Sequence, residues 1–356
     1  MTPQSLRACY NPIVFSRLRF TLMAEEPAEL DEYKGGLLRG CLGAALKRVS
    51  CVERDLACRS CLHHSECAYG YAFESVHIDA GDINESKDSK PLRTMRQASN
   101  DPLPIVLEPP LAPRSDYVPG DRLVFNLVMI GKGIGYLPVF IIAVADMAYR
   151  GLGRSRSRFE LDKVEDEFDR ARRLLYDSAS QRVSPYIPKL RSLNDAGKET
   201  MNLSHNQLEL LFMTPTRIKH RFGPQLEMSG MPSDRSDSRF ISSLDFATFM
   251  RTLMRRLSWL AEVHCEQPWN LDYDTLLAKA ESRVRVVKQN LRWQEWGRYS
   301  SRQNAVLKMG GFVGSVTFQG DLAEFLPYIK LGEYLHIGQG TAFGLGKYVI
   351  GTGHSQ

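Results

Sequence analysis

The sequence lacks both a long hydrophobic run and a hydrophobic leader. Its longest apolar stretch, 137–145, contains Pro138 and ends at Asp146, whereas a membrane-spanning helix needs roughly 18 apolar residues. The first ten residues include Arg7 and no apolar core, so they do not resemble a secretory signal. We therefore expect a cytoplasmic protein with no membrane partner.

The composition lacks a strong bias as well. With 43% hydrophobic and 24% charged residues, the chain is neither disordered nor fibrous, and 356 residues suggest about two domains. We find no acidic cluster that would hold two magnesium ions, which argues against a metal-dependent DNA nuclease. The net charge of +5 is compatible with a nucleic-acid partner without arguing for one.

Positive charge is concentrated in two segments. Residues 283–308 hold seven basic side chains, including Arg298 and Arg302, against the single acid Glu295, and two tryptophans and a tyrosine lie among them. Cations beside flat rings predict a surface for single-stranded RNA, while the alternative is a solvated strand with core aromatics. The second segment, 150–158, has four arginines, of which Arg154 and Arg156 are expected to contact an RNA backbone.

Four of the seven cysteines fall within seventeen residues: Cys51, Cys58, Cys61 and Cys67. So many thiols at such short spacing in a reducing compartment favour a metal over disulfides. We expect a structural zinc ion, and an iron–sulfur cluster is the alternative.

Hydrophobic periodicity predicts the same order of elements twice. The first set comprises a strand at 18–22, a helix at 37–46, strands at 104–108 and 122–130, a helix at 136–149 and a strand at 158–164. The second comprises a strand at 203–212, a helix at 244–264, strands at 284–293 and 311–319, a helix from Leu322 that Pro327 interrupts, and a strand at 347–350. This order predicts an α+β protein with two tandem ferredoxin-like (RRM-like, βαββαβ) domains. We place them at 1–198, with the four-cysteine metal knuckle inserted at about 51–67, and at 199–356.

A glycine-rich loop precedes the last strand. Gly338, Gly340, Gly344 and Gly346 follow the pattern GxGxxxGxG and lead into Lys347. The spacing is not that of a dinucleotide site, and no Ser or Thr follows the lysine as it would in a P-loop. Four glycines can expose a row of backbone N–H groups to a phosphate chain, so we expect the loop and Lys347 to bind RNA. A plain helix-to-strand connection is the alternative.

The segment 331–348 resembles the carboxy-terminal signature of the CRISPR precursor-RNA (pre-crRNA) processing endoribonucleases of the RAMP superfamily. Further similar segments occur in matching order at 37–40, 213–217, 298–303 and 309–314. The resemblance implies two ferredoxin-like domains and a metal-independent reaction on CRISPR repeat RNA. In this reaction the 2′-hydroxyl attacks the adjacent phosphate and leaves a 2′,3′-cyclic phosphate and a 5′-hydroxyl.

Such chemistry needs a base, an acid and a cation beside the phosphate. Members of the family commonly use a histidine of the first helix, but residues 34–50 contain none. We therefore consider His336, which a strand alternation would place on one face with Tyr334, and three residues at the first helix, namely Tyr33, Arg39 and Lys47. A non-cleaving RAMP subunit that holds guide RNA among other CRISPR effector subunits is the alternative function.

Overall fold

The computed structural model describes residues 12–63, 66–74, 102–219, 240–269, 271–295, 297–300 and 305–351. The chain forms two compact units. The amino-terminal unit is built from Phe15–Leu190 and Glu262–Glu266, and the carboxy-terminal unit from Arg191–Ala261 and Gln267–Gln356 with the segment up to Val14. The domain boundaries 1–198 and 199–356 stay a prediction.

An antiparallel sheet forms the centre of the amino-terminal unit. Its strand order is β3 (Ile105–Glu108), β5 (Arg122–Ile130), β1 (Val14–Ala24), β6 (Phe159–Asp166), β7 (Leu174–Asp177) and β8 (Arg182–Val183). The alternation in β1 has the expected effect, because Leu18 and Phe20 are fully buried while Arg19 remains half-exposed. Phe20 lies opposite Phe125 of β5, and their rings stack at 5.3 Å between centroids.

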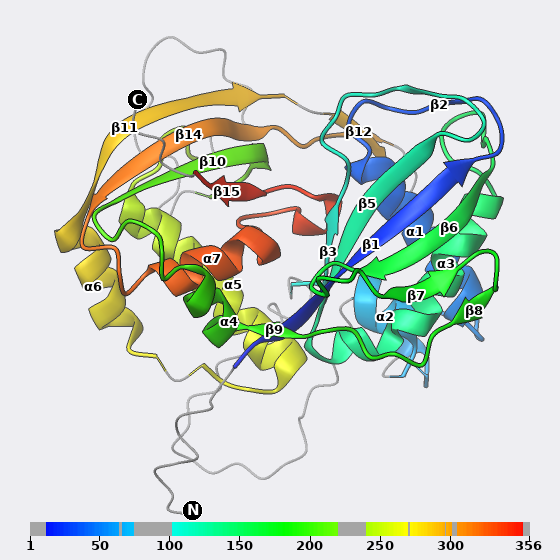
Figure 1. Cartoon of the computed structure of the whole chain (residues 1–356), viewed down its shortest axis with the longest axis horizontal. Coiled ribbons are helices and arrows are strands. Elements are labelled where there is room, and N and C mark those ends of the chain that lie inside the picture. Colours follow the sequence, from blue (N-terminus) through cyan, green and yellow to red (C-terminus); the bar gives the residue numbers. More distant parts are fainter. Residues whose placement is uncertain are drawn as a thin grey trace, which may run out of the picture. The chain divides into compact units, whose positions relative to one another are not determined.

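Two helices, α1 (Gly35–Ser50) and α3 (Leu137–Tyr149), pack on this sheet and on each other (Figure 1). Together with its preceding 3-10 turn, α3 forms a stretch, Gly131–Tyr149, long and apolar enough by length and composition to cross a membrane. The apolar segment is therefore longer than the stretch 137–145 identified from the sequence. Seven residues of α3 are buried in the unit core, and a core helix passes the same test.

Shorter elements complete this unit. They are β2 (Ala28–Glu29), which pairs with β4 (Asp116–Tyr117), the 3-10 turns η2 (Cys58–Ser60) and η4 (Gly131–Tyr136), and α2 (Ala68–Phe73). Sequence periodicity did not predict α2, because six residues are too few to show a helical repeat.

The carboxy-terminal unit has its own antiparallel sheet, in the order β11 (Val284–Gln294), β14 (Gly311–Gly320), β10 (Gln207–Thr216) and β15 (Tyr348–Ile350). Its helices are α4 (Leu193–Glu199), α5 (Phe246–Cys265, whose end belongs to the other unit), α6 (Tyr273–Arg283) and α7 (Leu326–Leu335). The short β9 (Arg191–Ser192) precedes α4, and the 3-10 turn η5 (Thr341–Phe343) precedes β15. Between β11 and β14, the strands β12 (Gly297–Ser300) and β13 (Ala305–Lys308) form a hairpin. Aromatic rings of β10, α5 and β15 meet in its core, where Phe249 and Tyr348 pack edge to face at 5.5 Å.

Both sheets confirm the predicted α+β class with antiparallel strands. Two details near the end of the chain differ from the prediction. Helix α7 begins at Leu326, and Pro327 lies in its first turn instead of interrupting it, because the N–H that proline lacks has no helical acceptor there. The predicted strand containing Tyr334 and His336 is wrong, since Tyr334 belongs to α7 and His336 caps its end.

Candidate nucleic-acid interface

The glycine-rich loop (338–346) connects α7 to β15. Gly338, Gly340, Gly344 and Gly346 all have φ between 74° and 83°. Side chains other than glycine strongly disfavour this left-handed region. The loop conformation therefore explains the four glycines before any ligand is considered.

Much of the loop backbone bonds within the protein. Gly346 N–H donates to Pro215 O at 3.1 Å, Gly344 N–H to Thr341 O at 2.9 Å and Lys347 N–H to the Thr214 hydroxyl at 2.9 Å. The expected outward-facing row of amides is thus not found at these three positions. Gly344 and Gly346 are buried, whereas Gly338 and Gly340 are half-exposed around an exposed Gln339, and this tip is the accessible part of the loop.

His336 supports the loop from inside. The residue is fully buried, with φ at 58°, and its Nδ1 lies 3.1 Å from Leu345 O. Arg256 Nε donates to the carbonyls of Leu335 and His336 at 3.0 and 3.1 Å. Burial lowers the pKa of Arg256 to about 10, so the guanidinium remains charged at neutral pH. This geometry suits His336 to holding the loop more than to meeting a substrate directly.

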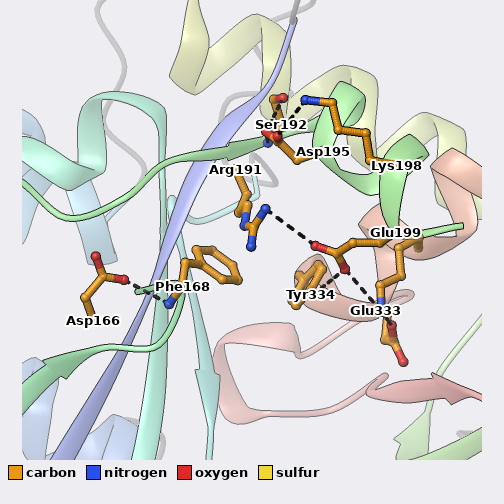
Figure 2. Close-up of polar contacts among 10 residues, drawn as sticks. Asp166, Phe168, Arg191, Ser192, Asp195, Lys198, Glu199, Glu333 and Tyr334 are labelled. Atoms are coloured by element: carbon orange, nitrogen blue, oxygen red, sulfur yellow. Dashed lines mark hydrogen bonds and ion pairs between the residues drawn. The ribbon is translucent and has the colours of Figure 1, made fainter. Parts of the chain in front are cut away.

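Tyr334 takes part in a separate polar network (Figure 2). Its hydroxyl donates to Glu199 of α4 at 2.8 Å, and Glu199 also pairs with Lys330 at 3.5 Å and with Arg191 at 3.8 Å. Glu333 accepts from Lys330 and from the N–H of Ile350 in β15. The network joins α4, α7 and β15, so Tyr334 has a structural task.

The sheet of the carboxy-terminal unit carries a row of cations on its edge strand. Arg285, Lys288, Asn290 and Arg292 of β11 are exposed and lie opposite Gln319, Thr317, Ser315 and Val313 of β14. Residues opposite each other in a ladder share a face, so these β11 residues form one polar face, which we call the basic sheet face. On the same face β10 contributes Glu209 and Leu211, both exposed. Such a surface suits a phosphate backbone.

Other residues of the predicted basic segment contribute differently. Trp293 is half-buried and donates from Nε1 to the exposed Glu295 at 2.6 Å, so its indole N–H already has an acceptor in the protein. Arg298 lies on β12, but its side chain falls outside the described residues, as does Arg302.

Arg154 and Arg156 are exposed on the turn between α3 and β6. This connection occupies the same place in its unit as the glycine-rich loop does in the other, between the last helix and the last strand of the predicted βαββαβ order. A Cβ at Gly151 would lie 2.0 Å from Arg156 O, and the bridge between Leu152 and Ser157 closes the turn. The turn is therefore compact, and it exposes two arginines at the surface.

The first-helix candidates lie along the side of α1 that meets α2. The Arg39 guanidinium is 5.0 Å from the Phe73 ring centroid, and the Lys47 ammonium is 5.6 Å from that of Tyr69. Helix α1 lies close to α2 here, because a Cβ at Gly43 would lie 2.9 Å from the Phe73 ring. Burial raises the pKa of Tyr33 far above its ordinary value, so its phenol remains protonated at physiological pH.

Cys51, Cys58, Cys61 and Cys67, which we call the cysteine cluster, are all half-buried. All four line one cavity of about 470 Å³, together with His63 and Glu66. Burial raises the pKa of Cys58, as do the charges of Glu74, Cys51 and Cys67, while Lys47 lowers it. Within the described ranges, no three His, Cys, Asp or Glu side chains already stand in the geometry of a metal site.

Sequence reasoning missed three residues that build the loop. The Thr214 hydroxyl donates to Gly344 O at 2.8 Å, and the Arg217 carbonyl accepts from Gln339 N–H at 3.0 Å. The Arg217 guanidinium lies 4.4 Å from the Phe240 ring centroid, and Arg256 supports His336 as described above. Thr214 and Arg217 lie in the segment 213–217 that carries the resemblance, which was the one available signal; Arg256 gave none.

Two family models match the chain. Residues 210–348 match the model for the CRISPR-associated endoribonuclease Cas6. Residues 12–187 match a model described as an N-terminal domain, AF_1859_N. No curated protein matches the chain in sequence.

Solved structures are similar in fold at low sequence identity. A Cas6 product complex is 17% identical with a TM-score of 0.54, covering 94% of this chain and 99% of that chain. Thermus thermophilus Cas6 is 16% identical with a TM-score of 0.50, covering 95% and 98%. A partial Cas6-RT-Cas1–Cas2 complex is 14% identical with a TM-score of 0.57, covering 97% of this chain and 47% of the other. The last match spans about half of its partner, and all three show likeness of fold.

Proposed function

We propose that this chain, whose residues 210–348 match the model of the CRISPR-associated endoribonuclease Cas6, is a member of that family and cuts CRISPR repeat RNA into guide RNAs. The basic sheet face is the observation that carries the RNA-binding part of this proposal. Three exposed cations, Arg285, Lys288 and Arg292, lie along one strand there, and a positively charged surface of this kind can follow a single-stranded backbone. The glycine-rich loop, through its half-exposed tip, and the arginines of the α3–β6 turn supply further backbone contacts.

We propose two tandem ferredoxin-like domains as the framework. In support, each unit has the order β-α-β-β-α-β, with the fourth strand beside the first and the second strand at the far edge. That arrangement is the split βαβ pattern. It leaves one face of each sheet free of its own crossover helices, and the basic sheet face is of this kind.

For the chemistry we propose that the 2′-hydroxyl attacks the adjacent phosphate, without a metal ion, and leaves a 2′,3′-cyclic phosphate and a 5′-hydroxyl. Arg39 supplies a permanent cation for the charge that develops on the phosphate. Lys47 is the donor we propose for the leaving oxygen. Tyr33 lies just before the same helix and is the alternative donor, although its raised pKa makes its phenol a weaker acid. His336 acts through the loop as a positioning residue.

The partners we propose are CRISPR repeat RNA and other CRISPR proteins, in the cytoplasm. A Cas6 product complex and a partial Cas6-RT-Cas1–Cas2 complex among the structural neighbours support these two classes.

The test is single-turnover cleavage of a repeat RNA in EDTA, with binding measured in parallel. Lys47→Ala or Arg39→Ala should slow cleavage by roughly a hundredfold or more, with RNA affinity changed by less than about threefold. Lys132→Ala, which removes an exposed lysine paired with Glu266, is the control and should cleave normally. A wild-type protein that shifts RNA on a gel but never cuts it would instead support the guide-holding subunit.

A further inference from the structure

The cysteine cluster joins the ends of two helices. Cys51 is the residue that ends α1, and its N–H bonds to Lys47 O at 2.9 Å. Cys67 precedes the first turn of α2, and its sulfur lies 3.8 Å from the Ser50 hydroxyl. The short segment from Cys51 to Cys67 therefore brings all four thiols to one cavity.

The two middle cysteines form a compact turn. Cys58 begins the 3-10 turn η2, and Cys61 N–H donates to Cys58 O at 3.3 Å. Two cysteines three positions apart in such a turn hold their sulfurs close enough for one ion, as in zinc knuckles. His63 and Glu66, on the same cavity wall, are not needed when four sulfurs are available.

We propose that the cysteine cluster binds one zinc ion, which fastens the end of α1 to the start of α2. Zinc takes four sulfur ligands in a tetrahedral arrangement, and up to four protons leave as the thiolates bind the ion. No oxidant or reductant takes part. All four cysteines bind the ion and leave no coordination position open, so the site is structural.

The site has a consequence for the helix face described above. Lys47 lies one turn before Cys51, and α2, which begins directly after Cys67, carries the Tyr69 and Phe73 rings that contact Lys47 and Arg39. The ion therefore holds two elements in place: α1, which carries Lys47 and Arg39, and α2, which carries the two aromatic rings. This consequence rests on the proposed function, whereas metal binding itself does not.

The experiment measures metal in the full-length protein. Freshly purified wild type should contain about one zinc per chain by elemental analysis. Cys58→Ser and Cys61→Ser should reduce that content at least tenfold, while Cys265→Ser and Cys41→Ser, which change cysteines outside the cavity, should retain it. The readout that separates the two pairs of variants is therefore the metal content and not the unfolding temperature, because Cys41 packs against the hydrophobic core and its serine variant also loses stability.

A second measurement covers the case in which the serine variants fail to fold. Wild type stripped of metal and titrated with Co²⁺ should develop the intense visible absorption of tetrahedral cobalt–thiolate coordination, and Zn²⁺ should abolish it. Wild type without bound metal and without a cobalt spectrum would overturn the site. A brown protein that contains iron and sulfide would overturn the choice of zinc. Loss of metal with unchanged cleavage would refute the link to Lys47 and Arg39 while leaving the metal site in place.

Discussion

Gly346→Ala tests whether the loop is primarily a built structure. An added Cβ would lie 1.8 Å from Ile337 O, and the residue has φ at 74°. The left-handed backbone costs a non-glycine residue about 1–2 kcal/mol, and the displaced carbonyl adds about 1 kcal/mol or more of overpacking. The hydrogen bond from Ile337 N–H to Gly346 O, 3.0 Å long, is lost with it. We expect the free energy of unfolding to fall by about 3 kcal/mol in total.

For a unit of this size, 3 kcal/mol corresponds to a drop in Tm of roughly 6–12 °C, which thermal unfolding monitored by circular dichroism will resolve. Gly197→Ala is the matched control in the same unit, because its Cβ would meet only Pro327, at 3.9 Å. Its Tm should stay the same or rise slightly. If Gly346→Ala unfolds like the control yet no longer binds repeat RNA, the loop is a contact surface and our structural interpretation fails.

Three further perturbations test other contacts of the structure. Lys34→Met should destabilise the protein by about 3 kcal/mol in urea unfolding, because the fully buried ammonium donates to three backbone carbonyls that would lose their partner; a change below about 1 kcal/mol would contradict this. Burial raises the pKa of Asp146, but hydrogen bonds from two arginines outweigh burial, so the folded pKa lies below the unfolded value of 3.8. The contribution of Asp146 to folding stability is therefore present above pH 3.8 and is lost as pH falls through the folded pKa. Asp146→Asn should flatten the dependence of stability on pH below about 4, and an unchanged acid limb would exclude this role. Replacing Arg285 and Arg292 together by Gln should weaken binding to all RNAs alike and reduce the slope of log K against log salt by about 1.4, whereas an unchanged slope would place RNA elsewhere.

Much of the fold could be predicted from periodicity alone. The alternation around Phe20 and the helical repeat of α5 located their elements to within a few residues, since burial of one face imposes the pattern directly. Helix α2 escaped because it is short. The start of α7 was missed because a proline is compatible with the first turn of a helix as well as with its interruption.

The candidate site was less accessible to sequence reasoning. Alternation assigned His336 to a strand, but the chain takes φ of 58° there and turns the side chain toward Leu345 O. The glycines of the loop were noticed for their spacing, yet two acceptors of the loop amides, Pro215 O for Gly346 and Arg217 O for Gln339, lie more than a hundred residues earlier. Such long-range hydrogen bonds leave no local pattern, and this is why Arg256 gave no signal.

The most direct test of the central claim is end-group analysis of repeat RNA cut by the purified protein in excess EDTA. We predict a single cut whose upstream fragment ends in a 2′,3′-cyclic phosphate and whose downstream fragment carries a 5′-hydroxyl. The cyclic end forms only when the RNA's own 2′-oxygen is the nucleophile, and a single 2′-deoxy substitution at the cut site should abolish cleavage. A 5′-phosphate on the downstream fragment, or cleavage that requires a divalent ion, would contradict the proposed mechanism.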